Sequence, residues 1–588
     1  MSTTTNTSGN EDFFKTTVMG HPAGLFTLFF TEMWERFSYY GMRALLVLFL
    51  TSSLIDGGWG WPRANALALY GTYTSMVYLT PLLGGMMADK YLGHRKAIIL
   101  GAILMTLGHA SMAMESQFFL YLGLILLIFG NGFFKPNMTS MVAKLYKDHP
   151  EKKDGAYTIF YMGVNSGAFL GIMLCGYIGE KVGFSWGFGL AGIFMFFGMM
   201  QFLLSQRIFG DVGLPPARNL VTGPQGQVQD ITSEANGGRL NPFTTTDLVL
   251  TAITALLALT WVINDPMSKV YGSNLFGNST NAGYVMLGCL FLFLFLLFSR
   301  IIRYSAVTRD RMFAVFIIAI FYMFFWASFE QAGGSMTIFA KDYVNRTLEG
   351  SGAVLFKIFN TLLTVVPLGI ITYALIRLFM VTFDKYATAT FSLGISFVII
   401  WGIVVWMLFK EFSKSSTEIA ATWFGILNSF FIIALGPLFA KIWESKYNPP
   451  ASVKYMFGLF MLGIGFFALS YGSADIPLGA KAASVSVIWL IIAYFFHTLG
   501  ELCISPVGLS YVSKLVPGRM IAITYGIWYL AIAVGNKVAG TMGGMIDSIS
   551  EEHGLSRFFL IFTVVPAAAG LVIFLLSPVL KKLMHGIR

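Results

Sequence analysis

Sixteen long apolar segments dominate this sequence and restrict its possible folds more than any other feature. A helix that crosses a bilayer needs about 20 mainly apolar residues, and each segment is close to or above that length. The segments cover residues 25–52, 66–88, 96–114, 118–144, 156–179, 186–208, 246–265, 282–303, 311–340, 353–380, 388–410, 417–444, 454–472, 485–514, 520–546 and 556–583. Only 12% of the residues are charged, about half the share in soluble domains. The sequence therefore predicts an all-α polytopic membrane protein and excludes a soluble enzyme or a disordered scaffold.

The remaining composition narrows the class further. The net charge is +10, but the basic residues are spread over short loops, so we expect anionic lipid and no nucleic acid as their partner. The three cysteines, Cys175, Cys289 and Cys503, all lie in apolar stretches, which indicates packing residues and neither a disulfide nor a metal site. Residues 1–12 are polar and do not resemble a cleavable signal peptide.

The order of the segments suggests two halves. Six segments precede a polar stretch at 210–245, which contains glycine and proline, and ten segments follow it. Lysine and arginine are concentrated in alternate loops, at 89–96 and 144–154. Because basic loops are retained on the cytoplasmic side, we expect both termini in the cytoplasm. A six-helix half, a cytoplasmic linker and a second helical half are typical of a two-lobed transporter.

A short loop motif agrees with this arrangement. Residues 84–96 read GGMMADKYLGHRK and resemble the helix 2–3 loop of the major facilitator superfamily. Small residues let two helix ends approach closely, and an aspartate beside basic residues can form ion pairs between helices. A basic turn that only obeys the positive-inside rule is the alternative interpretation.

The first apolar segment carries charges where a spanning helix should have none. On a helix, six polar side chains fall within an arc of roughly 140°. They are Glu32, Glu35, Arg36, Tyr39, Tyr40 and Arg43. Charged groups inside a span are costly and mark functional sites by default. The alternative, an interfacial helix end with ordinary ion pairs, is opposed by apolar sequence on both sides.

Other spans carry single ionisable groups. They are Lys135 before Pro136, Glu330, and Glu501, which follows His497 at helical spacing. Lys135 can also be explained as a lysine that extends to the inner membrane surface, and each lone glutamate as a structural hydrogen-bonding group. For Lys537 a functional role and a simple ion pair remain equally open. Together, Glu32, Glu35, Glu330 and Glu501 oppose Arg36, Arg43 and Lys135, so the fully ionised set carries one net negative charge.

These residues also carry a family resemblance. The run Glu32-x-x-Glu35-Arg36 resembles the ExxER signature of the proton-dependent oligopeptide transporters, the peptide branch of the major facilitator superfamily. Further stretches agree in order along nearly the whole chain: Tyr78-Leu79-Thr80-Pro81, Lys135-Pro136-Asn137, Phe160-Tyr161-x-x-x-Asn165, Phe329-Glu330-Gln331, Leu427-Asn428 through Gly436-Pro437, Gly500-Glu501 through Ser510, and Trp528. Jointly these motifs are specific, although no single one is.

The resemblance implies a role for each of these residues. Arg43 and Lys135 would bind the carboxylate of a di- or tripeptide, and Glu501 its ammonium group. The other implied substrate-binding residues are Tyr39, Tyr40, Tyr78, Asn165, Asn428 and Trp528. Glu32, Glu35, Arg36 and Glu330 would couple protons to transport. Neither a cofactor nor a metal is implied, since the driving force would be the proton gradient across a bacterial cytoplasmic membrane.

The resemblance further implies two six-helix bundles with additional inserted transmembrane helices. The expected division is a cytoplasmic tail at 1–24, a six-helix bundle at 25–209, a linker at 210–245, an additional hairpin at 246–310, core helix 7 at 311–340, an inserted helix pair at 341–416 and core helices 8–12 at 417–588. The inserted pair at 353–380 and 388–410 departs from the usual family plan, so we expect a structural or lipid-facing role for it.

Two other functions remain as alternatives. One is a proton-coupled transporter of another small anion or conjugate, such as nitrate. The other is an intramembrane enzyme, but the seven histidines are scattered and the sequence has no HExxH motif. The sequence does not give the oligomeric state, the peptide length preference or the proton stoichiometry.

Overall fold

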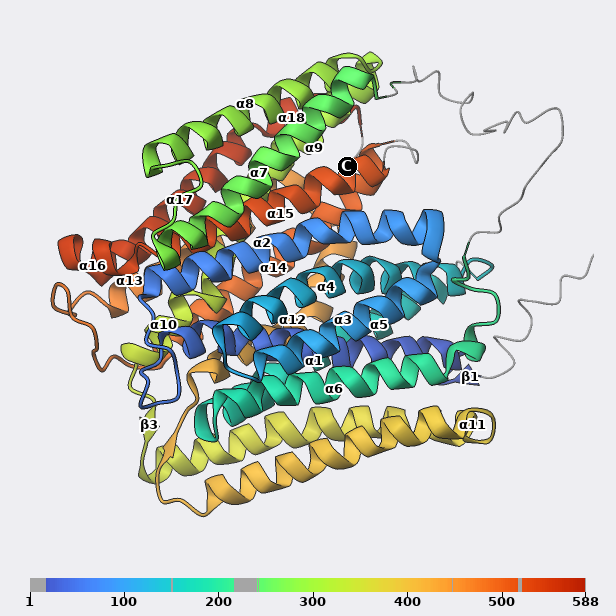
Figure 1. Cartoon of the computed structure of the whole chain (residues 1–588), viewed down its shortest axis with the longest axis vertical. Coiled ribbons are helices and arrows are strands. Elements are labelled where there is room, and N and C mark those ends of the chain that lie inside the picture. Colours follow the sequence, from blue (N-terminus) through green and yellow to red (C-terminus); the bar gives the residue numbers. More distant parts are fainter. Residues whose placement is uncertain are drawn as a thin grey trace, which may run out of the picture.

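The computed structural model describes residues 17–149, 152–215, 241, 243–446, 448–516 and 521–586, with the backbone alone for 506–514 and 521–523. Residues 1–16 of the expected tail and 216–240 of the expected linker lie outside the described part of the chain. Almost all the remaining residues are helical, and the helices run roughly along one direction (Figure 1). The structure confirms the predicted all-α architecture.

The N-terminal bundle follows the predicted segments closely. It comprises α1 (Ala23–Thr51), α2 (Arg63–Met87), α3 (His94–Met112), α4 (Gln117–Leu145), α5 (Lys153–Lys181) and α6 (Phe184–Leu204). A short pair of strands, β1 (Thr17–Val18) and β2 (His21–Pro22), precedes α1. Helix α2 begins at Arg63, three residues before the apolar segment expected at 66–88. Hydropathy missed this first turn because it is polar. Pro62 directly precedes the helix.

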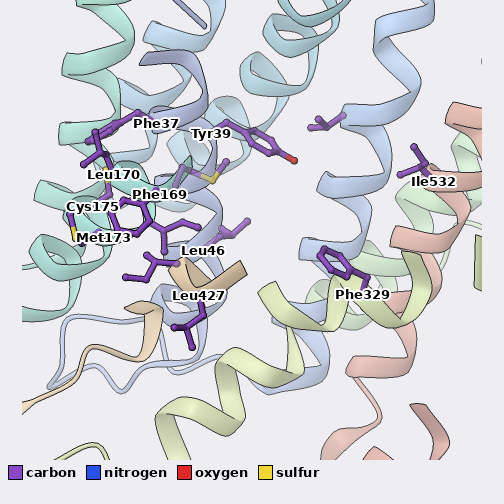
Figure 2. Packing of buried hydrophobic residues seen from close by; sticks show 14 of the residues in the cluster. Phe37, Tyr39, Leu46, Phe169, Leu170, Met173, Cys175, Phe329, Leu427 and Ile532 are labelled. Carbon is purple, nitrogen blue, oxygen red and sulfur yellow. The ribbon is translucent and has the colours of Figure 1, made fainter. Parts of the chain in front are cut away.

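Close packing of α1 against α5 depends on glycine. A Cβ atom on Gly167 would overlap the carbonyl oxygen of Met33, and one on Gly171 would overlap that of Phe37. Small residues at this spacing let two membrane helices approach closely. Figure 2 shows Phe37 of α1 beside Leu170 of α5 in the resulting apolar core. The backbones of α1 and α5 are therefore in direct contact at Gly167 and Gly171.

The C-terminal bundle contains two interruptions that hydropathy did not predict. Its elements are α9 (Ala306–Phe329), a 3₁₀ turn η4 (Glu330–Gly333), α10 (Ser335–Asp342), a 3₁₀ turn η5 (Ala421–Gly425), α12 (Ile426–Glu444), α13 (Ala451–Gly472), α14 (Ile488–Leu515), α15 (Ile521–Gly543), α16 (Ile546–His553), α17 (Leu555–Leu575) and α18 (Ser577–Leu583). The segment expected at 311–340 is broken at Glu330, where Gly333 and Gly334 follow. The segment expected at 556–583 divides at Leu576, just before Pro578.

Two helical hairpins lie on opposite flanks of the bundles (Figure 1). One consists of α7 (Thr245–Tyr271) and α8 (Ser279–Ile302), and α7 lies against α2. The other is α11 (Gly350–Phe412), whose two arms reverse direction at Tyr386, the residue with non-helical backbone angles. The hairpin runs beside α6 (Figure 1). Strands β3 (Thr347–Leu348) and β4 (Thr417–Glu418) pair at the base of α11.

The two bundles meet along two seams. Helix α2 lies against α15, where Gly71 faces Gly540 and Asn536 Nδ2 donates to the Thr74 carbonyl at 3.2 Å. Helix α5 lies against α12 along the second seam. Each hairpin therefore flanks one seam, and the seams determine which helices can face a central site.

Four long helices of the two bundles are less apolar than the others. Within the described residues, eleven helical segments are long and apolar enough to cross a membrane by length and composition, and α1, α2, α3 and α15 are not among them. Helix α1 is nevertheless 29 residues long and almost wholly buried. Its charged groups are shielded by the surrounding helices, which is where intramembrane ionisable groups are found.

Candidate functional site

The first part of the site is a three-residue ion cluster on α1. Arg36 Nε contacts the Glu35 carboxylate directly and lies 3.1 Å from Glu32 Oε1. Asn131 of α4 donates to the other oxygen of Glu35 at 3.2 Å. All three charged side chains are at most 5% exposed. One arginine therefore serves two carboxylates, so a proton on either one changes the balance of the cluster.

The second part joins the two bundles. Arg43 of α1 donates to Glu330 Oε2 at 2.6 Å, and Glu330 is only 1% exposed. Tyr70 of α2 accepts from Arg43 Nε at 2.9 Å and donates to the same carboxylate oxygen at 3.1 Å. A Cβ atom on Gly333 would overlap the Tyr70 hydroxyl, so the glycine after Glu330 makes room for this contact. The break between α9 and α10 thus shapes the site.

Aromatic side chains line the N-terminal side of the site. The Lys135 ammonium of α4 lies 4.5 Å from the centre of the Tyr78 ring, a favourable cation–π arrangement. The Tyr39 and Tyr40 rings contact each other edge to face at 5.1 Å. Arg43 also lies 5.7 Å from the Tyr40 ring. Cations and hydroxyl groups therefore occur together on α1, α2 and α4.

The C-terminal bundle supplies a carboxylate in a different setting. Glu501 of α14 accepts a hydrogen bond from Asn428 of α12 at 2.8 Å. The same amide lies 3.2 Å from the Thr498 hydroxyl. No cation lies within ion-pair distance of Glu501 among the described residues. This carboxylate is thus oriented by a neutral neighbour and is available to a positively charged group.

Three further residues named in the sequence analysis have partners of their own in the structure. Asn165 of α5 is buried and donates to the Tyr161 carbonyl at 2.9 Å. Trp528 of α15 is buried and stacks on Tyr322 with ring centres 4.3 Å apart. His497 does not share the surroundings of Glu501, because its ring packs against Phe466 of α13 at 4.4 Å. Helical spacing alone had placed these two residues on one face.

Lys537 has a simple partner. Its ammonium lies 2.6 Å from Asp265 of α7 and 2.8 Å from the Thr72 hydroxyl of α2. Of the two interpretations left open by the sequence, the structure supports the ion pair. Within the described residues, no group of three or more His, Cys, Asp or Glu side chains is arranged to hold a metal.

Sequence reasoning missed two residues of the site. Tyr70 gave no signal, because an uncharged tyrosine in an apolar segment is common, and only the fold brings it to Arg43 and Glu330. Asn131 lies four residues before Lys135 in the same predicted span, but its contact with Glu35 requires α1 and α4 to be adjacent. For Asn131, a polar side chain inside a predicted span was the only signal.

One end of the seams is closed by polar contacts. Arg63 at the start of α2 lies 2.6 Å from Asp342 and 2.7 Å from Asp547. Lys341 donates to Ser52 after α1 at 3.0 Å. Strand β1 lies at the opposite end of the helices (Figure 1). The end that contains Arg63 is called the Arg63 end below.

Two helical bundles that meet at a charged central site, with ionisable groups supplied from both sides, define a membrane transporter of the major facilitator type. The sequence profile of the POT family matches residues 95–223 and 389–559. The chain therefore belongs to the POT family.

Curated relatives support the assignment over the whole chain. The "Peptide transporter YePEPT" of Yersinia enterocolitica subsp. palearctica serotype O:3 is 30% identical over 599 aligned residues, which cover 100% of this chain and 99% of the relative. A "Di-/tripeptide transporter" of Lactococcus lactis subsp. lactis is 27% identical and covers 97% of this chain and 98% of its own.

Solved structures agree on the fold. The crystal structure of peptide transporter POT in complex with sulfate is 27% identical, with a TM-score of 0.70, and the match covers 98% of this chain and 99% of that one. A POT family transporter in complex with 5-aminolevulinic acid has a TM-score of 0.71 at 24% identity, over 98% of this chain and 100% of that one, and supports the fold.

Proposed function

We propose that this protein is a proton-coupled symporter that imports di- and tripeptides by alternating access. The names of the relatives support the substrate class, and the charges of the site fit it. A short peptide is a zwitterion, with a carboxylate at one end and an ammonium group at the other. The N-terminal bundle supplies Arg43 and Lys135, and the C-terminal bundle supplies Glu501 beside a neutral amide. Contacts to the two peptide ends leave its side chains free, which permits many sequences.

The roles follow from this arrangement. Arg43 and Lys135 bind the peptide carboxylate, and Glu501 binds the ammonium group. Polar and aromatic contacts to the peptide come from Tyr39, Tyr40, Tyr78, Asn165 and Asn428. Trp528 belongs to the same set of substrate-binding residues and stacks on Tyr322. Glu32, Glu35, Arg36 and Glu330 carry the proton coupling.

The ion pair between Arg43 and Glu330 is the single observation that carries the proposal. It joins the two bundles and uses one of the groups that would bind the substrate. A proton on Glu330 removes its charge, weakens the pair and leaves the guanidinium available to the peptide carboxylate. Tyr70 accepts from Nε of the same guanidinium, so it keeps Arg43 oriented during that exchange. Proton binding and peptide binding thereby favour the same rearrangement of the bundles.

The setting of the protein is proposed on the same basis. The chain is a multi-pass membrane protein of a transporter family. We place it in a bacterial cytoplasmic membrane with both termini inside, as the basic loops indicate. Transport proceeds without a cofactor and without covalent change to the substrate. The division of the chain at 24, 209, 245, 310, 340 and 416 stays a prediction.

Competition for uptake tests the substrate class. Purified protein is placed in proteoliposomes with an imposed inward proton gradient, and the uptake of labelled dialanine is measured with unlabelled di-, tri- and tetrapeptides and with nitrate. We expect di- and tripeptides to compete and nitrate to have no effect. Lack of competition by any peptide would overturn the peptide assignment, and competition by nitrate would favour the anion alternative.

A further inference from the structure

Hairpin α11 belongs to one bundle by chain order and lies against the other. It connects α10 to α12, both in the C-terminal bundle, but it packs along α6 and also contacts α1 and α5 (Figure 1). Phe397 of α11 meets Phe30 and Trp34 of α1 at ring distances of 5.7 and 5.6 Å. When the bundles move relative to each other, the strain must therefore fall on the two connectors, 343–349 and 413–420.

The two connectors are fastened to each other. Strands β3 and β4 pair with Thr347 opposite Glu418. The backbone N–H of Ile419 donates to the Arg346 carbonyl at 2.9 Å. Lys357 of α11 donates to the Lys414 carbonyl at 2.6 Å. The connectors consequently form one joint at the Arg63 end of the molecule.

A carboxylate of the N-terminal bundle binds directly beyond this joint. Glu180, in the last turn of α5, accepts from the backbone N–H of Ala421 at 2.7 Å. Its other oxygen accepts from the backbone N–H of Thr422 at 2.9 Å and from the Thr422 hydroxyl at 2.7 Å. Ala421 is the first residue of η5, which continues into α12. The first N–H groups of a helix have no partner within the helix and carry partial positive charge. Glu180 thus caps a helix of the opposite bundle.

Neighbouring charges reinforce the cap. Lys181 lies 2.6 Å from Glu418, and Arg346 lies 3.0 Å from Glu418 and 3.9 Å from Glu180. Tyr177 of α5 donates to Glu411 at the end of α11 at 2.7 Å. Positive and negative groups therefore alternate across the seam.

Helix α5 approaches η5 closely at Gly176. A Cβ atom on Gly176 of α5 would overlap the Thr422 hydroxyl. A cleft opens beside it between α5 and α11, but its carboxylates are already paired within the protein: Glu411 accepts from Tyr177, Thr417 and Lys414. The cluster therefore connects the two bundles and does not form a ligand site.

We propose that the Glu180 cap on η5 is a latch that holds the α5–α12 seam closed at the Arg63 end, and that it must release each time this end opens. The inference rests on alternating access, the cycle of the proposed function. Hairpin α11 supports the latch, because it holds the connector that carries Glu418 against α5. Opening exposes the N–H groups of Ala421 and Thr422 to water, which replaces the carboxylate. Weakening the latch therefore favours the conformation that is open at this end.

Distances between spin labels test the latch. In a background with Cys175, Cys289 and Cys503 replaced by alanine, labels are attached at Trp186 of α6 and Leu478 of the C-terminal bundle, both exposed. Double electron–electron resonance is recorded in nanodiscs. Glu180→Gln keeps the shape of the side chain but leaves one acceptor oxygen for three donors. We expect a longer-distance population that grows about tenfold relative to the closed one, as the loss of hydrogen bonds to a charged group permits.

Two companion variants complete the test. Gly176→Ala acts by steric overlap alone and should shift the distances in the same direction. Glu349→Gln changes an exposed carboxylate of the same joint and should leave them unchanged. Unchanged distances in both Glu180→Gln and Gly176→Ala, or an equal shift in Glu349→Gln, would overturn the latch. The readout needs no substrate, so a failure of peptide uptake would contradict the proposed function without affecting this result.

Discussion

Arg43 of the N-terminal bundle lies 2.6 Å from Glu330 of the C-terminal bundle, and the hydroxyl of Tyr70 contacts both side chains. The pair is almost fully buried, so removal of either charge alone would leave the other without a counterion, which is unfavourable in the interior. The two ways to relieve that cost are a proton on Glu330 and a substrate carboxylate on Arg43. This relationship links the proton, the peptide and the positions of the two bundles.

The Tyr70 hydroxyl should matter for the orientation of Arg43. Tyr70→Phe removes the acceptor for Arg43 Nε and the donor to Glu330, and a hydrogen bond to a charged group is worth roughly 1.5–3 kcal/mol. We expect KM for dialanine to rise about tenfold or more. Tyr73→Phe is the matched control, because the buried Tyr73 hydroxyl has no hydrogen-bond partner among the residues that the structure describes. Equal kinetics of the two variants would contradict the positioning role of Tyr70.

Glu501 should distinguish peptides with a free ammonium group from those without one. In the wild-type protein, dialanine should compete for uptake much better than N-acetyl-dialanine, which lacks that charge. Glu501→Gln removes the carboxylate, and loss of one partner of a buried charge pair costs roughly 2–5 kcal/mol. The variant should therefore bind both compounds with similar, weak affinity. Retained preference for the free ammonium group would assign its recognition to another residue.

The Lys537–Asp265 pair should affect stability. Asp265→Leu leaves the 4%-exposed ammonium of Lys537 without a counterion, and breaking a buried pair in this way costs roughly 3–5 kcal/mol. Thermal unfolding in detergent should show a clear decrease, and the double variant with Lys537→Met should recover most of it. Lys269, a second partner of Asp265 whose side chain is 31% exposed, provides the control, since Lys269→Met should change little. A double variant as unstable as Asp265→Leu would contradict the ion-pair explanation.

The stability contribution of Glu418 should depend on pH. Burial raises the pKa of Glu418, but the hydrogen bond from Lys181 and the charges of Arg346 and Lys181 outweigh it and hold the pKa below its usual value. A carboxylate with a lowered pKa in the folded state stabilises that state above its unfolded pKa, and this contribution is lost as the pH falls through the folded pKa. Glu418→Gln should therefore be less stable than the wild type at pH 7, and the two melting temperatures should converge as the pH falls below the unfolded pKa of glutamate, about 4.3, and through the lower folded pKa of Glu418. A difference independent of pH would contradict this account.

The sequence predicts helices far better than it predicts contacts. Hydropathy located the spanning segments within a few residues, because long apolar runs have few alternatives in a bilayer. It missed the break at Glu330, since two glycines in an apolar run change mean hydropathy very little. It also placed Arg63 in a loop, although this residue begins α2 and joins Asp342 and Asp547.

The site shows the same limit. The charges of α1 could be grouped from helical periodicity alone, because they lie on one element. The pairing of Arg43 with Glu330 spans 287 positions in the chain and depends on the packing of two bundles, which periodicity does not encode. Glu180 and Thr422 gave no signal at all, because each is an ordinary polar residue at the end of a segment. The seam between α5 and α12 creates their relationship.

Paired transport measurements on Glu330→Gln test the central claim most directly. In proteoliposomes, counterflow exchange of labelled dialanine reports peptide binding and movement of the bundles, whereas accumulation under an inward proton gradient reports coupling. The glutamine has nearly the shape of the glutamate but cannot exchange a proton. We expect exchange to persist and proton-driven accumulation to be lost. Accumulation to the wild-type level by Glu330→Gln would contradict the coupling of protons to peptide transport through the Arg43–Glu330 pair.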